Sequence, residues 1–92
     1  MRWRLFATLA KATGERDILV EVSDGTRLRE AFDKLVESHP ELKREVLDED
    51  GELSNHVRLL VDGNDPFVKA NGWETVLNED SEIALFPPVS GG

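Results

Sequence analysis

The chain has 92 residues, of which 39% are hydrophobic, a length and composition that predict one small domain. It has no cysteine, which excludes disulfides and thiolate metal ligands. Its 19 acidic and 11 basic residues give a formal net charge of −8, which disfavours binding to nucleic acids or anionic membranes and favours a partner with a basic surface. No stretch has the composition of a signal peptide or a membrane span, so we expect a cytoplasmic protein.

The N-terminal segment has the alternating pattern of a β-strand. Residues 2–9 place four apolar side chains on one face: Trp3, Leu5, Ala7 and Leu9. A strand of this kind covers a core on its apolar side. Residues 14–17 then form a turn, and the β-rich run 18–22 predicts a second strand. Because the link is short, we expect an antiparallel hairpin.

A long amphipathic helix follows the hairpin. Five apolar residues recur at helical spacing: Leu28, Ala31, Phe32, Leu35 and Val36. This stripe predicts a helix over 28–36 that packs one side on the core. Asp24 and Thr26 are the candidate N-cap residues, and Pro40 marks the end, because the residue before a proline leaves the helical region. Residues 41–47 have the composition of another helical turn or two.

The second half of the chain predicts two more strands. Residues 56–61 form the third strand, which ends at the turn pair 62–63. Residues 67–77 are expected to hold a short edge strand and a one-turn helix around Trp73. Residues 82–86 are a run of Glu, Ile, Ala, Leu and Phe that predicts the last strand.

The order of these elements points to one architecture. A helix between an N-terminal hairpin and later strands packs across one face of a sheet, which gives a two-layer α+β domain. The compact solution is a β-grasp (ubiquitin-like) fold, in which a mixed sheet packs on one main helix and the first and last strands are parallel and central. We therefore expect a β-grasp domain over 1–86 and an extended C-terminal tail over 87–92.

The last six residues form a distinct tail: Pro87, Pro88, Val89, Ser90, Gly91 and Gly92. The prolines end the sheet, because they lack N–H groups and fix φ, and they project the chain as a stiff extended segment. The glycines have no Cβ, which leaves the carbonyl carbon of Gly92 open to attack. A bare Gly-Gly end also fits a frayed terminus or a cloning scar. The stiff root directly after a strand favours a tail that enters a narrow channel in another enzyme.

The chemistry open to such a tail is acyl transfer. A carboxylate is a poor electrophile at neutral pH, so the terminal carboxyl group of Gly92 first needs activation. Adenylation by ATP would give an acyl phosphate anhydride, from which a sulfur donor forms a thiocarboxylate or a lysine amine forms an isopeptide bond. In either route the chain is substrate and carrier, and the partner enzyme supplies the catalytic groups.

No residues of the chain suggest catalysis or metal binding of its own. His39 and His56 stand at a helix end and a strand start, without cysteine or a close acidic partner that would complete a metal site. The serines lie in no nucleophile motif. We therefore expect a protein that is not an enzyme, binds no metal or cofactor of its own, and is a monomer.

Two stretches of the chain resemble a known family. Residues 5–9, Leu-Phe-Ala-Thr-Leu, and residues 82–92, which end in Pro-Pro-Val-Ser-Gly-Gly, are similar to the small subunit of molybdopterin synthase (MoaD) and to the small archaeal ubiquitin-like modifier proteins. The resemblance implies a β-grasp fold and activation of Gly92 by a ubiquitin-activating-type (MoeB-like) adenylyltransferase that uses ATP.

The resemblance also implies two fates for the activated chain. One is a thiocarboxylate at Gly92 that donates sulfur, either in molybdopterin biosynthesis with the synthase large subunit or in tRNA thiolation. The other is an isopeptide bond between Gly92 and lysines of target proteins. Both fates start from the same adenylate, so the sequence does not separate sulfur transfer from protein conjugation.

Alternation also predicts a surface for the partner. It places one set of apolar strand residues toward the helix: Leu5, Val57, Val61, Ile83 and Leu85. Another set then shares the opposite face, beside the root of the tail: Phe6, Leu60, Ala84 and Phe86. We hypothesise that these four residues, the sheet-face patch, dock the activating enzyme or the synthase partner. The alternatives are scattered surface residues, or a patch that residues 63–75 cover.

A second class of function stays open. A noncovalent ubiquitin-fold adaptor would bind partners through its exposed sheet face and would not need Gly91 or Gly92. Trimming these two residues separates the classes, since an adaptor keeps its activity and a carrier loses it.

Overall fold

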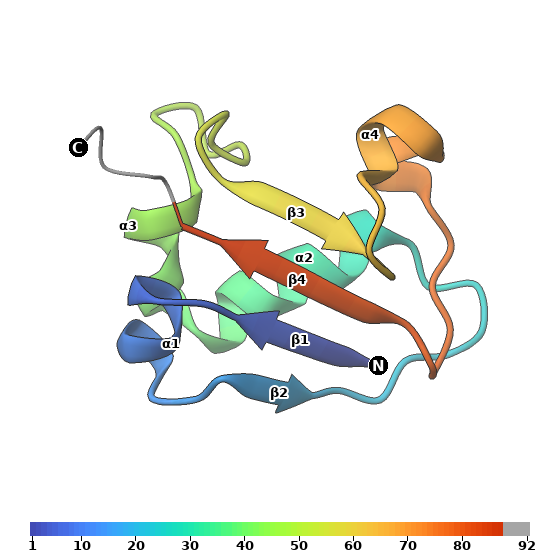
Figure 1. Cartoon of the computed structure of the whole chain (residues 1–92), viewed down its shortest axis with the longest axis horizontal. Helices are drawn as coiled ribbons and strands as arrows, with labels where there is room; N and C mark the ends of the chain where they lie inside the picture. Colours follow the sequence, from blue (N-terminus) through green and yellow to red (C-terminus); the bar gives the residue numbers. More distant parts are fainter. Residues whose placement is uncertain (88–92) are drawn as a thin grey trace.

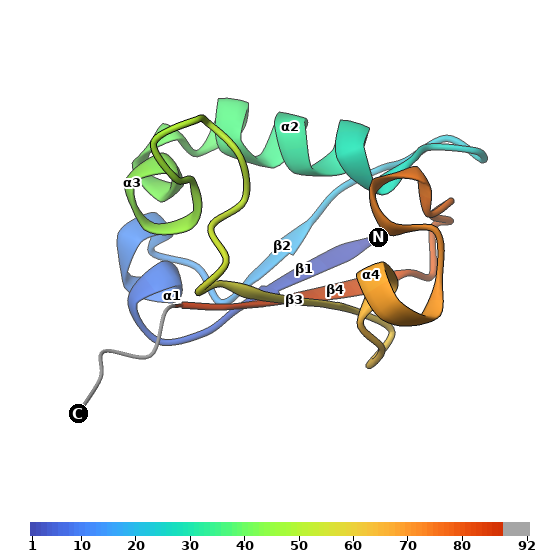
Figure 2. The same cartoon turned by 90° about the horizontal axis from the view of Figure 1, so that it is seen from above.

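The computed structural model describes residues 1–87, which fold into a four-stranded sheet covered on one face by helix α2 (Figures 1 and 2). The strands are β1, Arg2–Leu5; β2, Asp17–Leu19; β3, Arg58–Val61; and β4, Glu82–Phe86. The helices are α1, Thr8–Thr13; α2, Leu28–Ser38; α3, Lys43–Val46; and α4, Pro66–Lys69. Two short 3-10 helices complete the elements: η1, Pro40–Leu42, and η2, Gly72–Glu74. None of the helices in this described part of the chain is long and apolar enough to cross a membrane.

The sheet has the order β2-β1-β4-β3, so the first and last strands are its central pair. β1 and β4 run parallel, whereas β1 pairs with β2 and β4 pairs with β3 in antiparallel orientation. Helix α2 follows the β1–β2 pair in the chain and crosses one face of the sheet (Figure 2). This mixed sheet on one main helix confirms the predicted β-grasp.

The core lies between α2 and the sheet. All five apolar residues of the predicted helical stripe are buried: Leu28, Ala31, Phe32, Leu35 and Val36. On the sheet, Trp3 is 1% exposed and Ile83 and Leu85 are fully buried. The Trp3 ring lies 6.5 Å from the ring of Phe32. Each such side chain contributes roughly 1.5–3 kcal/mol by its burial, so packing rather than helix propensity holds α2 in place.

The first strand is shorter than its alternating pattern predicts. β1 ends at Leu5, and the chain turns at Ala7, whose φ of 51° and ψ of −121° lie outside the strand region. Helix α1 follows, and its Leu9 is fully buried in the core. The predicted strand over 2–9 is therefore wrong beyond Leu5. The four residues from Leu9 onward are Leu, Ala, Lys and Ala, which are strong helix formers that override a weak alternation.

The two other predicted strands around the helix also differ in extent. β2 pairs antiparallel with β1, as predicted, but it ends at Leu19 instead of residue 22, and α1 occupies the connection. β3 begins at Arg58 instead of residue 56. The additional helical turns predicted for 41–47 are present as η1 and α3.

The N-terminus of α2 is capped differently from the prediction. Neither Asp24 nor Thr26 caps the helix, because Arg27 takes the N-cap position. The Thr26 hydroxyl instead donates to the Ser23 carbonyl oxygen at 2.8 Å. The Glu30 carboxylate reaches back from the first turn and accepts the Arg27 backbone N–H at 3.3 Å. A glutamate at this position satisfies the cap from inside the helix.

The segment between β3 and β4 is mostly helical. Trp73 lies in η2, which confirms the predicted one-turn helix. Helix α4 stands where an edge strand was expected, and the only pairing of that kind within residues 67–77 is a single bridge between Val76 and Arg27. Asp65 caps α4, because its carboxylate accepts the Phe67 backbone N–H at 2.8 Å. The Asp-Pro pair that starts α4 is a helix-start signal that outweighs the β-rich residues after it.

Ala7→Gly is expected to raise the free energy of unfolding by about 1 kcal/mol. A residue with a Cβ is strained at the φ of 51° and ψ of −121° that Ala7 adopts, whereas glycine adopts these angles freely. The matched control is Ala12→Gly inside α1, which is expected to lose about 1 kcal/mol. Urea unfolding measures both variants. Equal losses in the two variants would contradict a strained turn at Ala7.

Candidate functional site

Strand β4 carries the C-terminal tail to one end of the sheet. It pairs with β1 on one side and β3 on the other, and its Ile83 and Leu85 side chains are fully buried. Phe86 ends the strand opposite Arg58, the first residue of β3, and Pro87 follows directly (Figure 1). The tail therefore begins from a strand that is held on both edges and on one face.

The remaining residues of the predicted tail lie outside the described residues: Pro88, Val89, Ser90, Gly91 and Gly92. Their roles stay predictions from the sequence. The structure defines the root from which they start, which is Pro87 at the end of β4.

The four residues of the sheet-face patch lie together on the face of the sheet away from α2. The Phe6 and Phe86 rings are stacked, with centroids 4.4 Å apart and planes 11° apart. Leu60 lies directly opposite Ala84 in the β3–β4 ladder. Phe6 is 38% exposed, and the other three are half-buried. The structure thus joins all four into one apolar surface beside Pro87.

The segment 63–75 does not cover this surface. Its Trp73 ring packs 5.2 Å from the ring of Phe32 on α2 and 5.2 Å from the ring of Phe67. These contacts place η2 on the helix side of the sheet, whereas α4 stands beside β3 at the edge of the sheet (Figure 2). The patch therefore stays open within the described part of the chain.

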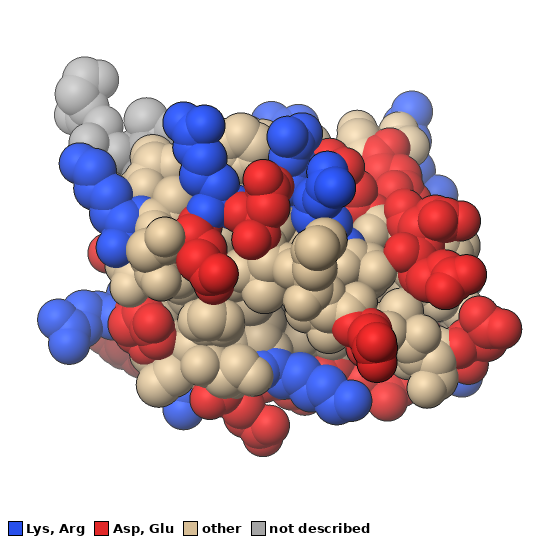
Figure 3. Space-filling model, turned by 90° about the horizontal axis from the view of Figure 1, so that it is seen from below, with Lys and Arg blue, Asp and Glu red and all other residues tan. Residues whose placement is uncertain are grey.

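Charged side chains around the patch are largely paired with one another. Arg4, next to Ala84 across the β1–β4 ladder, lies 3.3 Å from Asp17 and 3.4 Å from Glu82. Arg2 lies 3.9 Å from Glu82. Exposed ion pairs contribute about 0–1 kcal/mol each, so their main effect is on the local charge. Figure 3 shows acidic side chains gathered at its right-hand end, while several basic ones stand along the upper margin.

The structure adds Arg58 to the candidate site. It is exposed on the same face as Phe86, directly across the ladder from it. Within residues 1–87, no carboxylate lies at ion-pair distance from Arg58. The alternation that placed Leu60 on this face also places Arg58 there, two residues earlier, so the sequence held the signal.

The free face of the sheet does not share the strong acidity of the whole chain. Its charged strand residues are Arg2, Arg4, Arg58, Asp17 and Glu82. The net charge of −8 predicts a basic partner surface, but that expectation applies to the rest of the molecule rather than to this face.

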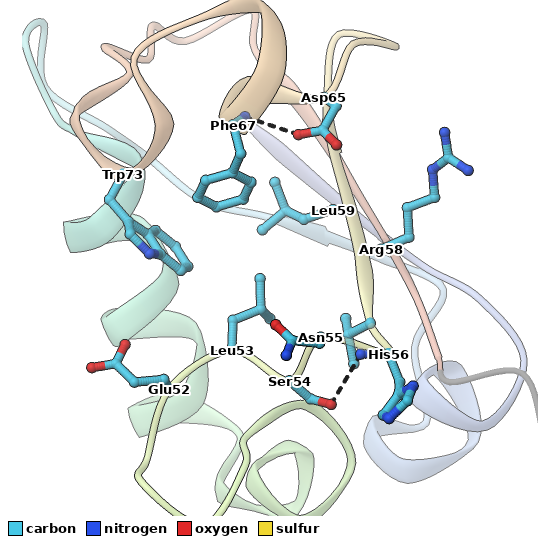
Figure 4. Close-up of a pocket in the computed structure, with 11 residues that line it drawn as sticks. Glu52, Leu53, Ser54, Asn55, His56, Arg58, Leu59, Asp65, Phe67 and Trp73 are labelled. Atoms are coloured by element: carbon cyan, nitrogen blue, oxygen red, sulfur yellow. Dashed lines mark hydrogen bonds between the residues drawn. The ribbon is translucent and has the colours of Figure 1, made fainter.

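One hollow of the described chain is lined by both apolar and polar residues. It measures about 660 Å³ and lies beside β3 on the helix side, where Leu53, Leu59, Phe67 and Trp73 form apolar walls (Figure 4). Its polar groups serve local structure. The His56 backbone N–H, not its imidazole, donates to Ser54 Oγ at 3.2 Å, and the Asp65 carboxylate caps α4. The hollow therefore lacks a nucleophile aligned with a base.

The predicted histidines are far from forming a metal centre. His39 follows α2, and its Nδ1 lies 3.8 Å from a Glu41 carboxylate oxygen, so the expected lack of a close acidic partner is wrong for this histidine; His56 precedes β3. No three His, Cys, Asp or Glu side chains within residues 1–87 are grouped so that they could hold a metal ion.

Comparison with known proteins covers both the fold and the tail. Residues 3–92 match the model of the ThiS family. The chain is 42% identical over 92 residues to small archaeal modifier protein 1 of Haloferax volcanii, and the match covers 100% of each chain. The crystal structure of SAMP1 from Haloferax volcanii superposes with a TM-score of 0.83 at 40% identity, covering 99% of this chain and 97% of that one. A putative molybdopterin converting factor, subunit 1, from Pyrococcus furiosus superposes with a TM-score of 0.73 at 25% identity, covering 96% of this chain and 95% of that one.

Proposed function

Because this chain belongs to the ThiS family, we propose that it is a ubiquitin-like carrier or modifier that works through the carboxyl group of Gly92. The observation that carries the proposal is the position of the tail, which follows directly from the central strand of a β-grasp sheet and has the sequence Pro-Pro-Val-Ser-Gly-Gly.

The first step is activation of Gly92 by an adenylating enzyme of the ubiquitin-activating (MoeB-like) type. The carboxylate oxygen attacks the α-phosphorus of ATP, an anhydride forms between chain and AMP, and pyrophosphate leaves. ATP is a substrate of the partner enzyme, and this chain binds no cofactor. The glycines suit the step because the carbonyl carbon of Gly92 has no side chain beside it.

Two reactions can follow from the adenylate. Hydrosulfide from a sulfur donor attacks the carbonyl carbon of the adenylate, the bond to AMP breaks, and loss of a proton leaves a thiocarboxylate on Gly92. This sulfur is then donated in molybdopterin biosynthesis, with a synthase large subunit as partner, or in tRNA thiolation. A lysine amine of a target protein displaces AMP, loses a proton, and forms an isopeptide bond with Gly92. In both reactions AMP is the leaving group and the chain supplies the acyl group.

The length of the tail suits this division of labour. Residues 88–92 span at most about 17 Å when fully extended, which is enough to enter a partner's active site while the β-grasp domain stays outside. The stiff proline root reduces the conformational entropy that the tail loses on entry. Docking of the domain then falls to the surface nearest Pro87, which is the sheet-face patch with Arg58.

Phe86→Ala is expected to lower the rate of adenylation at limiting partner concentration by about tenfold, since it removes one ring of the Phe6–Phe86 stack from the docking surface. The matched control is Leu19→Ala, which also removes an exposed apolar side chain from this face, but at the β2 edge. Initial rates of adenylation, measured against the concentration of the partner enzyme, compare the two variants with the wild type. Wild-type rates in a folded Phe86→Ala chain would exclude docking at the patch.

The experiment that tests the proposed function is intact-mass analysis of the protein isolated from its native cell. Replacement of one oxygen by sulfur in the C-terminal peptide indicates the thiocarboxylate route. Lysines of other proteins that carry the C-terminal fragment of this chain after digestion indicate conjugation; with trypsin this fragment is residues 70–92, because Lys69 is the last basic residue. A chain that never carries either mark, under growth conditions where it is abundant, would contradict the proposal.

A further inference from the structure

A groove lies between the second edge strand, β2, and helix α2. It has a volume of about 370 Å³. Apolar side chains from β2, from the segment directly after it and from α2 line the groove: Ile18, Val20, Val22, Ala31 and Leu35. The three residues from the β2 side are only partly buried and pack against the core. The sheet order places this groove at the opposite edge from β3, with β1 between it and the strand that carries the tail (Figure 1).

The outer edge of β2 presents backbone groups without partners. The Arg16 carbonyl oxygen accepts the Leu5 N–H at 2.7 Å. The Val20 N–H donates to the Met1 carbonyl oxygen at 2.9 Å. Alternation along an antiparallel ladder therefore directs the N–H and C=O groups of Asp17 and Leu19 away from β1. No backbone group within residues 1–87 pairs with them. Such an edge is a template for one more strand.

The charged groups at the groove favour a ligand with basic residues. Glu21 and Glu37 line it, and neither carboxylate has an ion-pair partner within the described chain. The net charge of −8 adds a long-range attraction for a basic ligand. Lys34 also lines the groove, so a ligand with basic residues at one end fits better than one that is basic throughout.

We propose that β2 and α2 form a binding site for an extended segment of a partner protein in which alternating apolar residues adjoin Lys or Arg. The segment adds as a strand to the edge at Asp17 and Leu19 and places its apolar side chains in the groove. The site leaves the tail and the sheet-face patch unoccupied, so a partner can bind a chain that is being activated or is already conjugated. The inference rests on the β2 edge and does not depend on the fate of Gly92.

The test uses synthetic peptides and the full chain. One acetylated peptide carries valine or isoleucine at every second position, followed by lysines. A second peptide carries glutamates in place of the lysines. Amide chemical-shift changes, followed by NMR during titration, locate the binding. The lysine peptide is expected to shift the Asp17 and Leu19 amides most and to bind at least about tenfold more tightly than the glutamate peptide.

Two variants at one position separate strand addition from surface adhesion. Leu19→Pro removes the outward N–H without breaking a hydrogen bond to β1, because the Leu19 backbone groups point away from it. This variant is expected to bind the lysine peptide at least about tenfold more weakly than the wild type does. Leu19→Ala keeps the N–H and is expected to bind as the wild type does. A third variant, Glu37→Lys, leaves the strand untouched and is expected to reverse the preference between the two peptides.

Three results would overturn the proposal. The first is an absence of shifts at Asp17 and Leu19 in the titration. The second is equal binding of the lysine peptide by Leu19→Ala and a folded Leu19→Pro chain, with Glu37→Lys keeping the wild-type preference. The third is a dimer, seen by sedimentation, that buries the β2 edge and excludes the lysine peptide, because the occupant would then be a second copy of this chain.

Discussion

A chain shortened by Gly91 and Gly92 is expected to fold normally and to lose its charging by the adenylating partner. The buried core lies within residues 1–87, so the free energy of unfolding should not change. The new terminus would be the carboxylate of Ser90, which falls short of the partner's ATP site by two residues, about 7 Å. Misplacement of a reacting group by even 1 Å costs about 100-fold, so the rate of ATP-dependent pyrophosphate exchange should fall by at least that factor.

A second variant separates the reach of the tail from its slimness. Gly92→Ala keeps the length and the terminal carboxylate but adds a methyl group beside the carbonyl carbon. Its exchange rate is expected to lie between those of the wild type and the shortened chain. If the shortened chain exchanged pyrophosphate at the wild-type rate, activation would not occur at Gly92. If it also kept every cellular function, the noncovalent adaptor would be the better account.

Trp3→Ala is expected to lower the free energy of unfolding by about 3–5 kcal/mol, which is the usual loss for a buried tryptophan. This is the largest loss that we expect from a single substitution in this chain. Trp3 is 1% exposed, lies between Ile18 and Ile83 in the sheet, and packs on Phe32 of α2. Its removal leaves a cavity where sheet and helix meet. Because domains are stable by only about 5–15 kcal/mol, the variant should be partly unfolded at physiological temperature.

The control for Trp3→Ala is Phe6→Ala, which removes another aromatic ring from the same N-terminal segment. Phe6 is 38% exposed and stacks on Phe86 on the free face, so its loss is expected to cost about 1 kcal/mol. Urea unfolding, followed by the far-UV circular dichroism of the backbone, measures the free energy of unfolding of both variants. Similar losses in the two variants would contradict a core that lies on one face of the sheet only.

The parts of the fold that the sequence predicted well are those with a strong period. The stripe from Leu28 to Val36 repeats at helical spacing over two turns, and all of it is buried. The last strand, 82–86, has the predicted bounds, since β-rich residues stand between a polar turn and a proline. Placing the helix between these strands left few ways to form one core, which is why the parallel central pair was predictable.

The parts that the sequence did not predict depend on local backbone geometry. Alternation through residues 2–9 gave no sign of the positive φ at Ala7 that ends the strand. The cap of α2 at Arg27 depends on Glu30 reaching back, whereas Asp24 and Thr26 have the residue types of stronger caps. Helix α4 depends on the cap at Asp65. In each case one local contact outweighed a plausible pattern.

The candidate site divides in the same way. Alternation brought Phe6, Leu60, Ala84 and Phe86 to one face, because the side-chain period of a strand is fixed. The charge of that face was not predictable from the whole-chain value of −8, since local charge depends on which residues share a face. The open β2 edge and its groove required the topology, because the strand order decides which strands have a free side.

In the proposed function, the terminal carboxyl group of Gly92 is the group that a partner enzyme activates. The most direct test is mass analysis of the full chain after incubation with ATP and the adenylating enzyme of its native cell, with fragmentation to locate the modification. We expect an adenylyl group on the C-terminal glycine in the presence of ATP and none without ATP. An adenylyl group on any other residue, or none while the enzyme charges another acceptor, would contradict it.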